Sequence, residues 1–130
     1  MFELIRHHEW SRAKTAAEKL LETQPTNSLL HAYRGLCYFE EENWAVAAES
    51  FRRATFLDPK YWQAASKLAE CYQRLHKYRE GLEVCQEFII VNPNDPALES
   101  LLQYFQEMAK LPLQGWERTS HLAHEITMND

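Results

Sequence analysis

Apolar residues recur along this chain at intervals of three and four, the spacing that places side chains on one face of an α-helix. Leu29, Ala32, Leu36 and Phe39 form one such stripe. Prolines separate the segments, because proline lacks a backbone N–H and disfavours helical geometry in the residue before it. The pattern predicts an all-α chain with helices over residues 2–7, 10–23, 28–41, 44–57, 62–75, 78–91 and 96–109.

Residue types also return with a period of 34 positions, in five independent columns. The columns are Pro25, Pro59 and Pro93; Trp10, Trp44 and Tyr78; Leu20, Ala54 and Phe88; Gly35 and Ala69; and Tyr38 and Tyr72. Five columns in one register are very improbable by chance. Self-similarity at a fixed period is the signature of repeat architectures, so we expect an array of similar helical units.

The period and these residues resemble the tetratricopeptide repeat, a helix–turn–helix unit of 34 residues with the pattern W-x2-L-G-x2-Y…A-x3-F…P. Residues 28–61 match the pattern best, with Gly35, Tyr38, Trp44, Ala47, Phe51, Ala54 and Pro59. Residues 62–95 match it in Leu68, Ala69, Tyr72, Tyr78, Phe88 and Pro93. Residues 1–27 match only its second half, in Trp10, Ala13, Ala17, Leu20 and Pro25.

The resemblance implies an α-solenoid of antiparallel helix pairs. We expect a repeat domain over residues 1–110, with a truncated first repeat at 1–27, full repeats at 28–61 and 62–95, and a capping helix at 96–110. Residues 111–130 leave the repeat and form a C-terminal tail, in which a short helix over 120–126 is one outcome that the sequence does not decide.

Small residues in the repeat pattern predict where helices approach closely. Gly35 shares its column with Ala69, so Gly35→Leu is expected to force two helices apart. Gly81 shares its column with alanines, so Gly81→Ala is expected to be tolerated, with alanine improving helix propensity by up to about 1 kcal/mol. Leu20 and Phe88, large where the family has alanine, are interpreted as repacked core.

The first repeat begins at Met1 with little more than half of its expected first helix. Either the chain is a shortened form, or another chain covers that end. The helix face that bears Trp10, Ala13 and Ala17 would then be partly exposed. An uncapped repeat face tends to be covered by a second copy, so self-association through this end is expected.

In the tetratricopeptide family, the first helices of successive repeats line a concave groove that holds a peptide of a partner protein. Projecting the repeat register onto this chain predicts an apolar groove that becomes mixed in charge near its middle. The predicted groove residues are Phe2, Ile5, Leu29, Ala32, Tyr33, Leu36, Phe39, Gln63, Ser66, Lys67, Glu70, Arg74, Leu101, Tyr104 and Met108.

Composition narrows the class of protein. The chain has 130 residues, 45% hydrophobic and 25% charged, as in an ordinary globular domain. Its net charge of −5, with scattered basic residues, argues against nucleic-acid binding. Apolar runs are too short to cross a membrane and the N-terminus does not read as a secretory signal, so a cytoplasmic location is expected.

Candidate chemistry is sparse. Cys37, Cys71 and Cys85 have no CxxC spacing and are interpreted as reduced core residues. His121 and His124 would share a helical face, but without a third ligand they are interpreted as solvated tail residues. Nucleotide-binding and hydrolase motifs are absent from the sequence. We expect a non-enzyme with neither a metal ion nor a cofactor.

The sequence therefore favours a small adapter that binds a peptide segment of another protein. The alternative is a small chaperone that holds the apolar segment of one client, as type III secretion chaperones with similar repeats do. A receptor for Hsp70 or Hsp90 tails is disfavoured, because the positions of its carboxylate clamp offer only Lys67 as suitable chemistry.

Overall fold

The computed structural model describes residues 9–110. Within this range the chain forms six helices: α2 (Trp10–Thr23), α3 (Ser28–Glu40), α4 (Trp44–Leu57), α5 (Trp62–Arg74), α6 (Tyr78–Val91) and α7 (Pro96–Lys110). Each begins at the predicted residue and ends within one residue of the predicted end. The predicted helix over residues 2–7 and the C-terminal tail lie outside the described residues.

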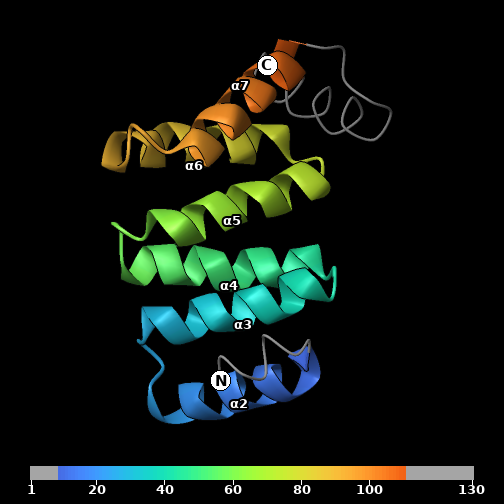
Figure 1. Cartoon of the computed structure of the whole chain (residues 1–130), viewed down its shortest axis with the longest axis vertical. Helices are drawn as coiled ribbons and strands as arrows, with labels where there is room; N and C mark the ends of the chain where they lie inside the picture. The colour runs from blue at the N-terminus through green and yellow to red at the C-terminus, as the bar shows by residue number, and fades with distance from the viewer. Residues whose placement is uncertain (1–8, 111–130) are drawn as a thin grey trace, which may run out of the picture.

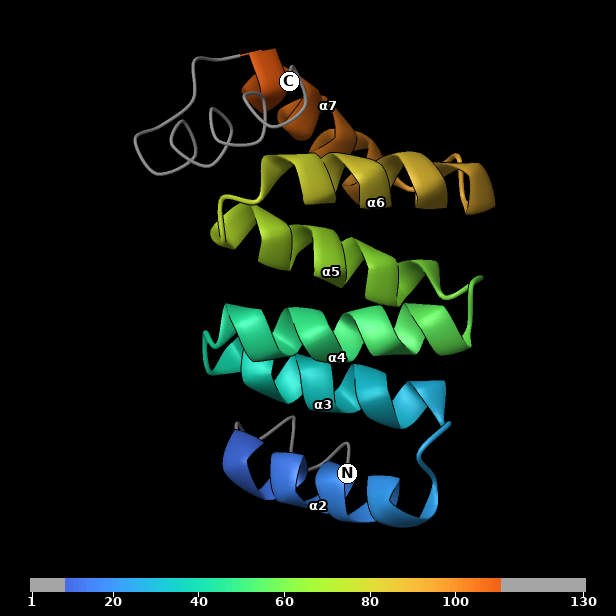
Figure 2. The same cartoon turned by 180° about the vertical axis from the view of Figure 1, so that it is seen from behind.

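The helices stack in sequence order from α2 to α7, with each packed against the next (Figures 1 and 2). Contacts between α5 and α7 add a link between the first helices of successive units. All-α architecture built from antiparallel helix pairs is thereby confirmed. Repeat arrays of this kind derive their stability from nearest-neighbour interfaces, because each unit touches only the units beside it.

Local hydrogen bonds explain where the helices begin and turn. The side-chain oxygen of Asn27 accepts hydrogen bonds from the backbone N–H groups of Leu29 and Leu30 at 3.1 and 3.3 Å, which caps α3. Glu42 and His76, which lie 34 positions apart, have φ angles of 61° and 60°. A left-handed residue just after a helix lets the chain reverse, so the same turn joins the two helices of both repeats.

Burial of the three cysteines is confirmed, since Cys37, Cys71 and Cys85 are free and fully buried. Burial raises the pKa of Cys37 to about 11 and the pKa values of Cys71 and Cys85 to about 12. The thiolate is the reactive form, and it is a very small fraction of each group near neutral pH.

We therefore expect all three thiols to resist iodoacetamide at pH 8 in the folded chain and to react rapidly in denaturant. Mass spectrometry of the alkylated protein measures the difference. Because the folded pKa values are raised, the protonated thiol stabilises the fold below the unfolded pKa, and this contribution is lost as pH rises above about 9. Rapid alkylation of a cysteine in the native chain would contradict its burial.

Two sequence expectations about packing are corrected. Phe88 lies in the core beside Ala65 and Leu98, but Leu20 is 41% exposed. Within residues 9–110, the extensive packing of α2 is against α3, and this packing does not cover Leu20. Conversely, Ala13 and Ala17 have no exposed surface and Trp10 is half-buried, so the partly exposed face expected on α2 is absent at the two alanines, and self-association stays a prediction.

The surroundings of Gly81 argue against the expectation that Gly81→Ala is tolerated. A Cβ atom built at Gly81 would overlap the ring of Phe105, which is fully buried. Phe105 occupies the repeat position that Cys37 and Cys71 hold in the preceding units. Helix α7 therefore has a large ring where the preceding units have a small thiol, and the α6 residue that faces this ring is a glycine.

Candidate peptide-binding face

The first helices of the repeats, α3, α5 and α7, share one face of the stack. Lys67 of α5 reaches α3, with its Nζ 4.6 Å from the ring centroid of Phe39. We call the surface formed by the described members of the predicted groove set the α3–α5–α7 face. Its members are Leu29, Ala32, Tyr33, Leu36, Phe39, Gln63, Ser66, Lys67, Glu70, Arg74, Leu101, Tyr104 and Met108.

On α3 the predicted apolar stripe divides into exposed and packed residues. Leu29 is 46% exposed and Tyr33 is half-buried. Leu36 and Phe39 are partly buried and pack against the central core, and Ala32 belongs to that core. A partner can therefore reach mainly the N-terminal half of the stripe, and substitutions at Leu36 will affect folding.

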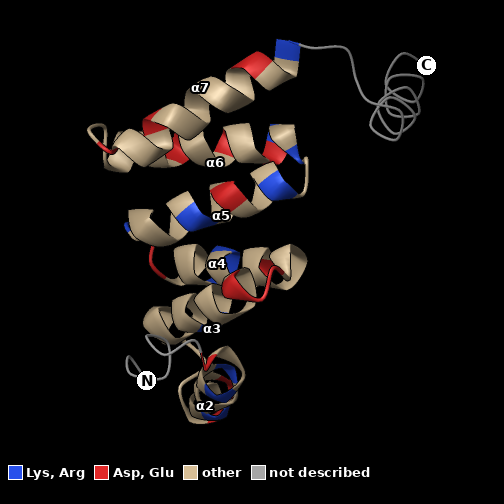
Figure 3. Cartoon of the chain, turned by 45° about the vertical axis from the view of Figure 1, so that its right-hand side comes forward, with Lys and Arg blue, Asp and Glu red and all other residues tan. Residues whose placement is uncertain are grey.

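Helix α5 presents the polar part of the face. Gln63 and Arg74 are exposed, whereas Ser66 is buried. Lys67 Nζ lies 3.7 Å from Glu70 Oε2, and both side chains are about one third exposed or more. Figure 3 shows residues of both signs along α5. An exposed ion pair contributes little to stability, so Lys67 and Glu70 are available to a charged partner.

Helix α7 contributes aromatic and aliphatic surface. Tyr104 packs with its ring centroid 6.1 Å from that of Tyr78 and 5.4 Å from that of Phe105. Leu101 is buried in the core, and Met108 is half-buried. Phe2 and Ile5, which the sequence also assigns to the groove, lie outside the described residues.

Sequence reasoning missed one aromatic residue beside this face. Trp44 begins α4, yet its ring lies 5.0 Å from that of Phe39 in an edge-to-face contact, and the Arg74 guanidinium lies 5.4 Å from the Trp44 ring. The repeat pattern assigns Trp44 to helix packing, so only its partial exposure reveals that it borders the face. Together, Trp44, Arg74 and Lys67 surround Phe39 with aromatic and cationic groups.

Catalytic or metal-binding chemistry is not evident in the described residues. No group of three histidine, cysteine, aspartate or glutamate side chains among residues 9–110 could hold a metal ion. In the same range, no helix has the length and apolar character needed to span a bilayer. The face can bury apolar surface, stack on aromatic rings and pair charges, which are the means of peptide recognition.

The family comparison identifies the repeat type. Residues 6–88 match the family model described as "Anaphase-promoting complex, cyclosome, subunit 3". Tetratricopeptide repeat protein 5 of Bos taurus is 37% identical over an alignment of 72 residues that covers 53% of this chain. The chain covers 16% of that relative's length.

Solved structures show the same fold at low sequence identity. The first tetratricopeptide domain of Spaghetti (RPAP3), bound to the HSP90 peptide SRMEEVD, has a TM-score of 0.79 at 20% identity and covers 84% of this chain and 86% of that one. The type III secretion chaperone SycD of Yersinia enterocolitica, in complex with a peptide of the translocator YopD, has a TM-score of 0.77 at 16% identity and covers 84% and 88%.

Proposed function

Because the chain belongs to the tetratricopeptide-repeat family described as anaphase-promoting complex, cyclosome, subunit 3, we propose that it is a non-catalytic adapter that binds a peptide segment of a partner protein on its α3–α5–α7 face. The observation that carries this proposal is the exposure of Leu29 beside the half-buried Tyr33. Apolar side chains left accessible on a helix that already has a committed core face are typical of binding surfaces.

The face suggests what kind of peptide it accepts. An apolar side chain would pack near Leu29 and Tyr33, and polar or charged side chains would meet Lys67, Glu70 and Arg74 on α5. Burial of apolar area contributes roughly 25 cal/mol per Å², from which the loss of rigid-body and side-chain freedom is subtracted. A short linear segment bound with moderate affinity fits this chemistry.

A chaperone for one client is the second candidate, and the likeness to SycD in complex with a YopD peptide favours it. An adapter and a chaperone differ in what binding does to the partner. Suppression of the aggregation of a client at one-to-one stoichiometry would identify the chaperone. Peptide binding without such protection would identify the adapter.

Recognition of an Hsp70 or Hsp90 tail is less well supported. The likeness to the peptide-bound Spaghetti domain is at 20% identity and concerns the fold alone. Such tails end in a carboxylate that needs several Asn, Lys or Arg side chains on the first helices. At the positions of that clamp this chain has Lys67, which already contacts Phe39 and Glu70.

The cellular location belongs to the same proposal. Three buried free cysteines support a reducing compartment such as the cytoplasm, because disulfides form and persist in oxidising ones.

Charge reversal on the face is the test of the proposed function. Peptides that bind the full chain are selected from a displayed random library, and their affinities are measured by fluorescence polarisation. We expect Lys67→Glu and Leu29→Glu to weaken the selected peptides at least about tenfold, which corresponds to about 1.4 kcal/mol. Melting temperatures should change little, since both side chains are substantially exposed.

Lys60→Glu is the matched control, because Lys60 is exposed in the turn before α5 and lies outside the face. Its peptide affinity should equal that of the wild-type chain. Leu36→Glu is a poor test, since Leu36 packs against the core and its loss would confuse folding with binding. Selected peptides that bind Lys67→Glu and Leu29→Glu normally would place their site elsewhere on the chain.

A further inference from the structure

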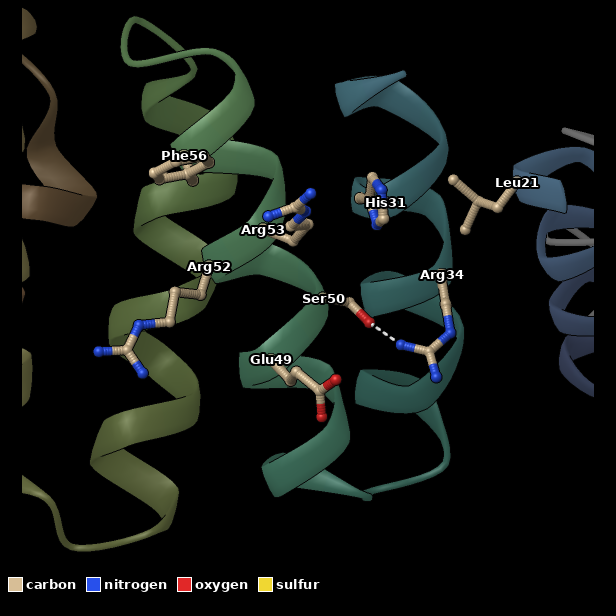
Figure 4. Close-up of a pocket in the computed structure, with 8 residues that line it drawn as sticks. All are labelled: Leu21, His31, Arg34, Glu49, Ser50, Arg52, Arg53 and Phe56. Carbon is tan, nitrogen blue, oxygen red and sulfur yellow. Dashed lines mark hydrogen bonds between the residues drawn. The ribbon is translucent and has the colours of Figure 1, made fainter. Parts of the chain in front are cut away.

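A second surface lies between the helices α2, α3 and α4. It is a pocket of about 520 Å³ whose lining combines cationic and apolar side chains. The basic side chains in the lining are His31, Arg34, Arg52 and Arg53. Leu21 and Phe56 supply apolar surface. Figure 4 shows Arg53 of α4 extending toward His31 of α3, while Arg52 lies on the other flank of α4.

This pocket faces away from the α3–α5–α7 face. His31 and Arg34 are three positions apart and share one side of α3. Leu29, Tyr33 and Leu36 lie on the opposite side of the same helix, because two residues of offset turn a helical position by about 200°. The pocket is therefore independent of the surface to which peptide binding is assigned above.

Arg34 is held in place before any ligand arrives. Its Nη1 donates a hydrogen bond to Ser50 Oγ at 2.6 Å, and Ser50 is 1% exposed. Its Nε lies 3.6 Å from Glu18 Oε2, and its Cζ lies 4.9 Å from the centroid of the Tyr38 ring. A guanidinium fixed from three sides loses little further freedom when it meets an anion.

The repeat itself does not require this polar lining. At the positions of Arg34 and Ser50, the next repeat has Leu68, which is buried in the core, and Val84, which packs against it. At the positions of Arg52 and Arg53, it has Gln86 and Glu87. The cationic pocket is thus a local feature of the second repeat and not a consequence of helix packing.

Charge in the pocket is incompletely balanced. Glu18 pairs with Arg34, and among the described residues that line the pocket Glu49 is the one carboxylate. Within residues 9–110, neither Arg52 nor Arg53 has a carboxylate at ion-pair distance. The Arg53 guanidinium instead lies 5.5 Å from the ring of Phe56, a side chain that is 73% exposed.

We propose that this pocket binds an acidic peptide segment that carries an aliphatic side chain next to its carboxylate. The carboxylate pairs with Arg53, because a guanidinium presents two parallel N–H donors that match the two carboxylate oxygens, and Arg34 adds positive charge to the pocket. The aliphatic side chain packs on Phe56 and Leu21. A nucleic-acid backbone is a poorer fit, since it requires a continuous basic track and the corresponding residues of α6 are Gln86 and Glu87.

The test uses the full chain and two synthetic peptides labelled with fluorescein. One has the sequence Asp-Leu-Asp-Glu-Leu-Asp, and the other replaces each acid by its amide. We expect the acidic peptide to bind at low salt, with binding weakened as salt increases, and the amide peptide to bind at least tenfold more weakly. Arg53→Glu should reduce the affinity for the acidic peptide at least tenfold.

Lys60→Glu is the charge-matched control and should keep wild-type affinity. Because Arg53 and Lys60 are both exposed, both variants should melt like the wild-type chain. Arg52→Glu is a second variant, expected to weaken binding through the same electrostatic field.

The proposal would be overturned if the acidic peptide failed to bind at millimolar concentration, or if the amide peptide bound equally well. Full binding by Arg53→Glu would overturn it too, as would displacement of the peptide by a short RNA at lower concentration. Loss of acidic-peptide binding in Lys67→Glu with retention in Arg53→Glu would also overturn it and assign the peptide to the α3–α5–α7 face. The two tests can fail separately. If the peptides selected from the library bound Lys67→Glu normally, the proposed function would fail, but the result for the acidic peptide and Arg53→Glu would still stand.

Discussion

Phe105→Ala is expected to lower the free energy of unfolding by about 3–5 kcal/mol, the range for removing a large buried aromatic side chain. Phe105 of α7 is fully buried against α6, where it contacts Tyr78 and covers Gly81, and it also packs on Tyr104 of its own helix. The loss would appear as a lower midpoint in urea denaturation followed by circular dichroism. A variant with a wild-type midpoint would show that α7 does not depend on this ring.

Gly81→Ala tests the same contact from the other side. We expect it to destabilise the wild-type chain, because the overlap with the Phe105 ring outweighs the gain of up to about 1 kcal/mol in helix propensity. The double variant Gly81→Ala/Phe105→Cys restores the pair of residue types found one repeat length earlier, Ala47 of α4 and Cys71 of α5. Its loss of stability should be smaller than the sum of the single losses. Strict additivity would contradict direct contact.

Gly35→Leu is expected to cost about 3 kcal/mol or more and to unfold the second repeat first. A Cβ atom at Gly35 would lie 2.9 Å from two atoms of the Phe51 ring, and Phe51 is 2% exposed. Leucine adds three further carbon atoms in the same direction, so α3 and α4 must separate.

Thermal melting of Gly35→Leu beside Gly35→Ala measures the effect. The alanine variant should lose much less, because its single methyl group needs only a small shift of the ring and alanine favours the helix. Replacement of Phe51 by leucine in the Gly35→Ala background should recover part of that loss. If Gly35→Leu melts at the wild-type temperature, the assignment of this close approach is incorrect.

The 34-residue period and its prolines were sufficient to predict the helices of the described region to within one residue at each end. Helix boundaries are local properties: Asn27 caps α3 through its own neighbours, and Pro25, Pro59 and Pro93 each stand two residues after the helix that precedes them. The all-α architecture followed from the same local information, because repeats of one type stack in sequence order.

The candidate binding face could be predicted in outline but not in detail. Helical spacing placed Leu29, Ala32 and Leu36 on one side of α3. A spacing pattern indicates which side of a helix a residue occupies, but it does not indicate how deeply the residue is buried. How deeply each residue is buried depends on the neighbouring helices. Ala32 lies in the core and Leu36 packs against it, whereas Leu29 at the helix start remains 46% exposed.

By itself, the sequence determined the repeat type, the helices, the burial of the cysteines and the close approach at Gly35, since each depends on residues near in sequence or repeated in register. Only the tertiary structure decided that Gly81 faces Phe105, that Leu20 is left exposed, and that Arg34 and Ser50 line a pocket. Those outcomes depend on which side chain the adjacent helix presents, and a change in one helix is compensated in the other. Packing between helices is a property of pairs of residues, and a single column of the repeat shows only one member of each pair.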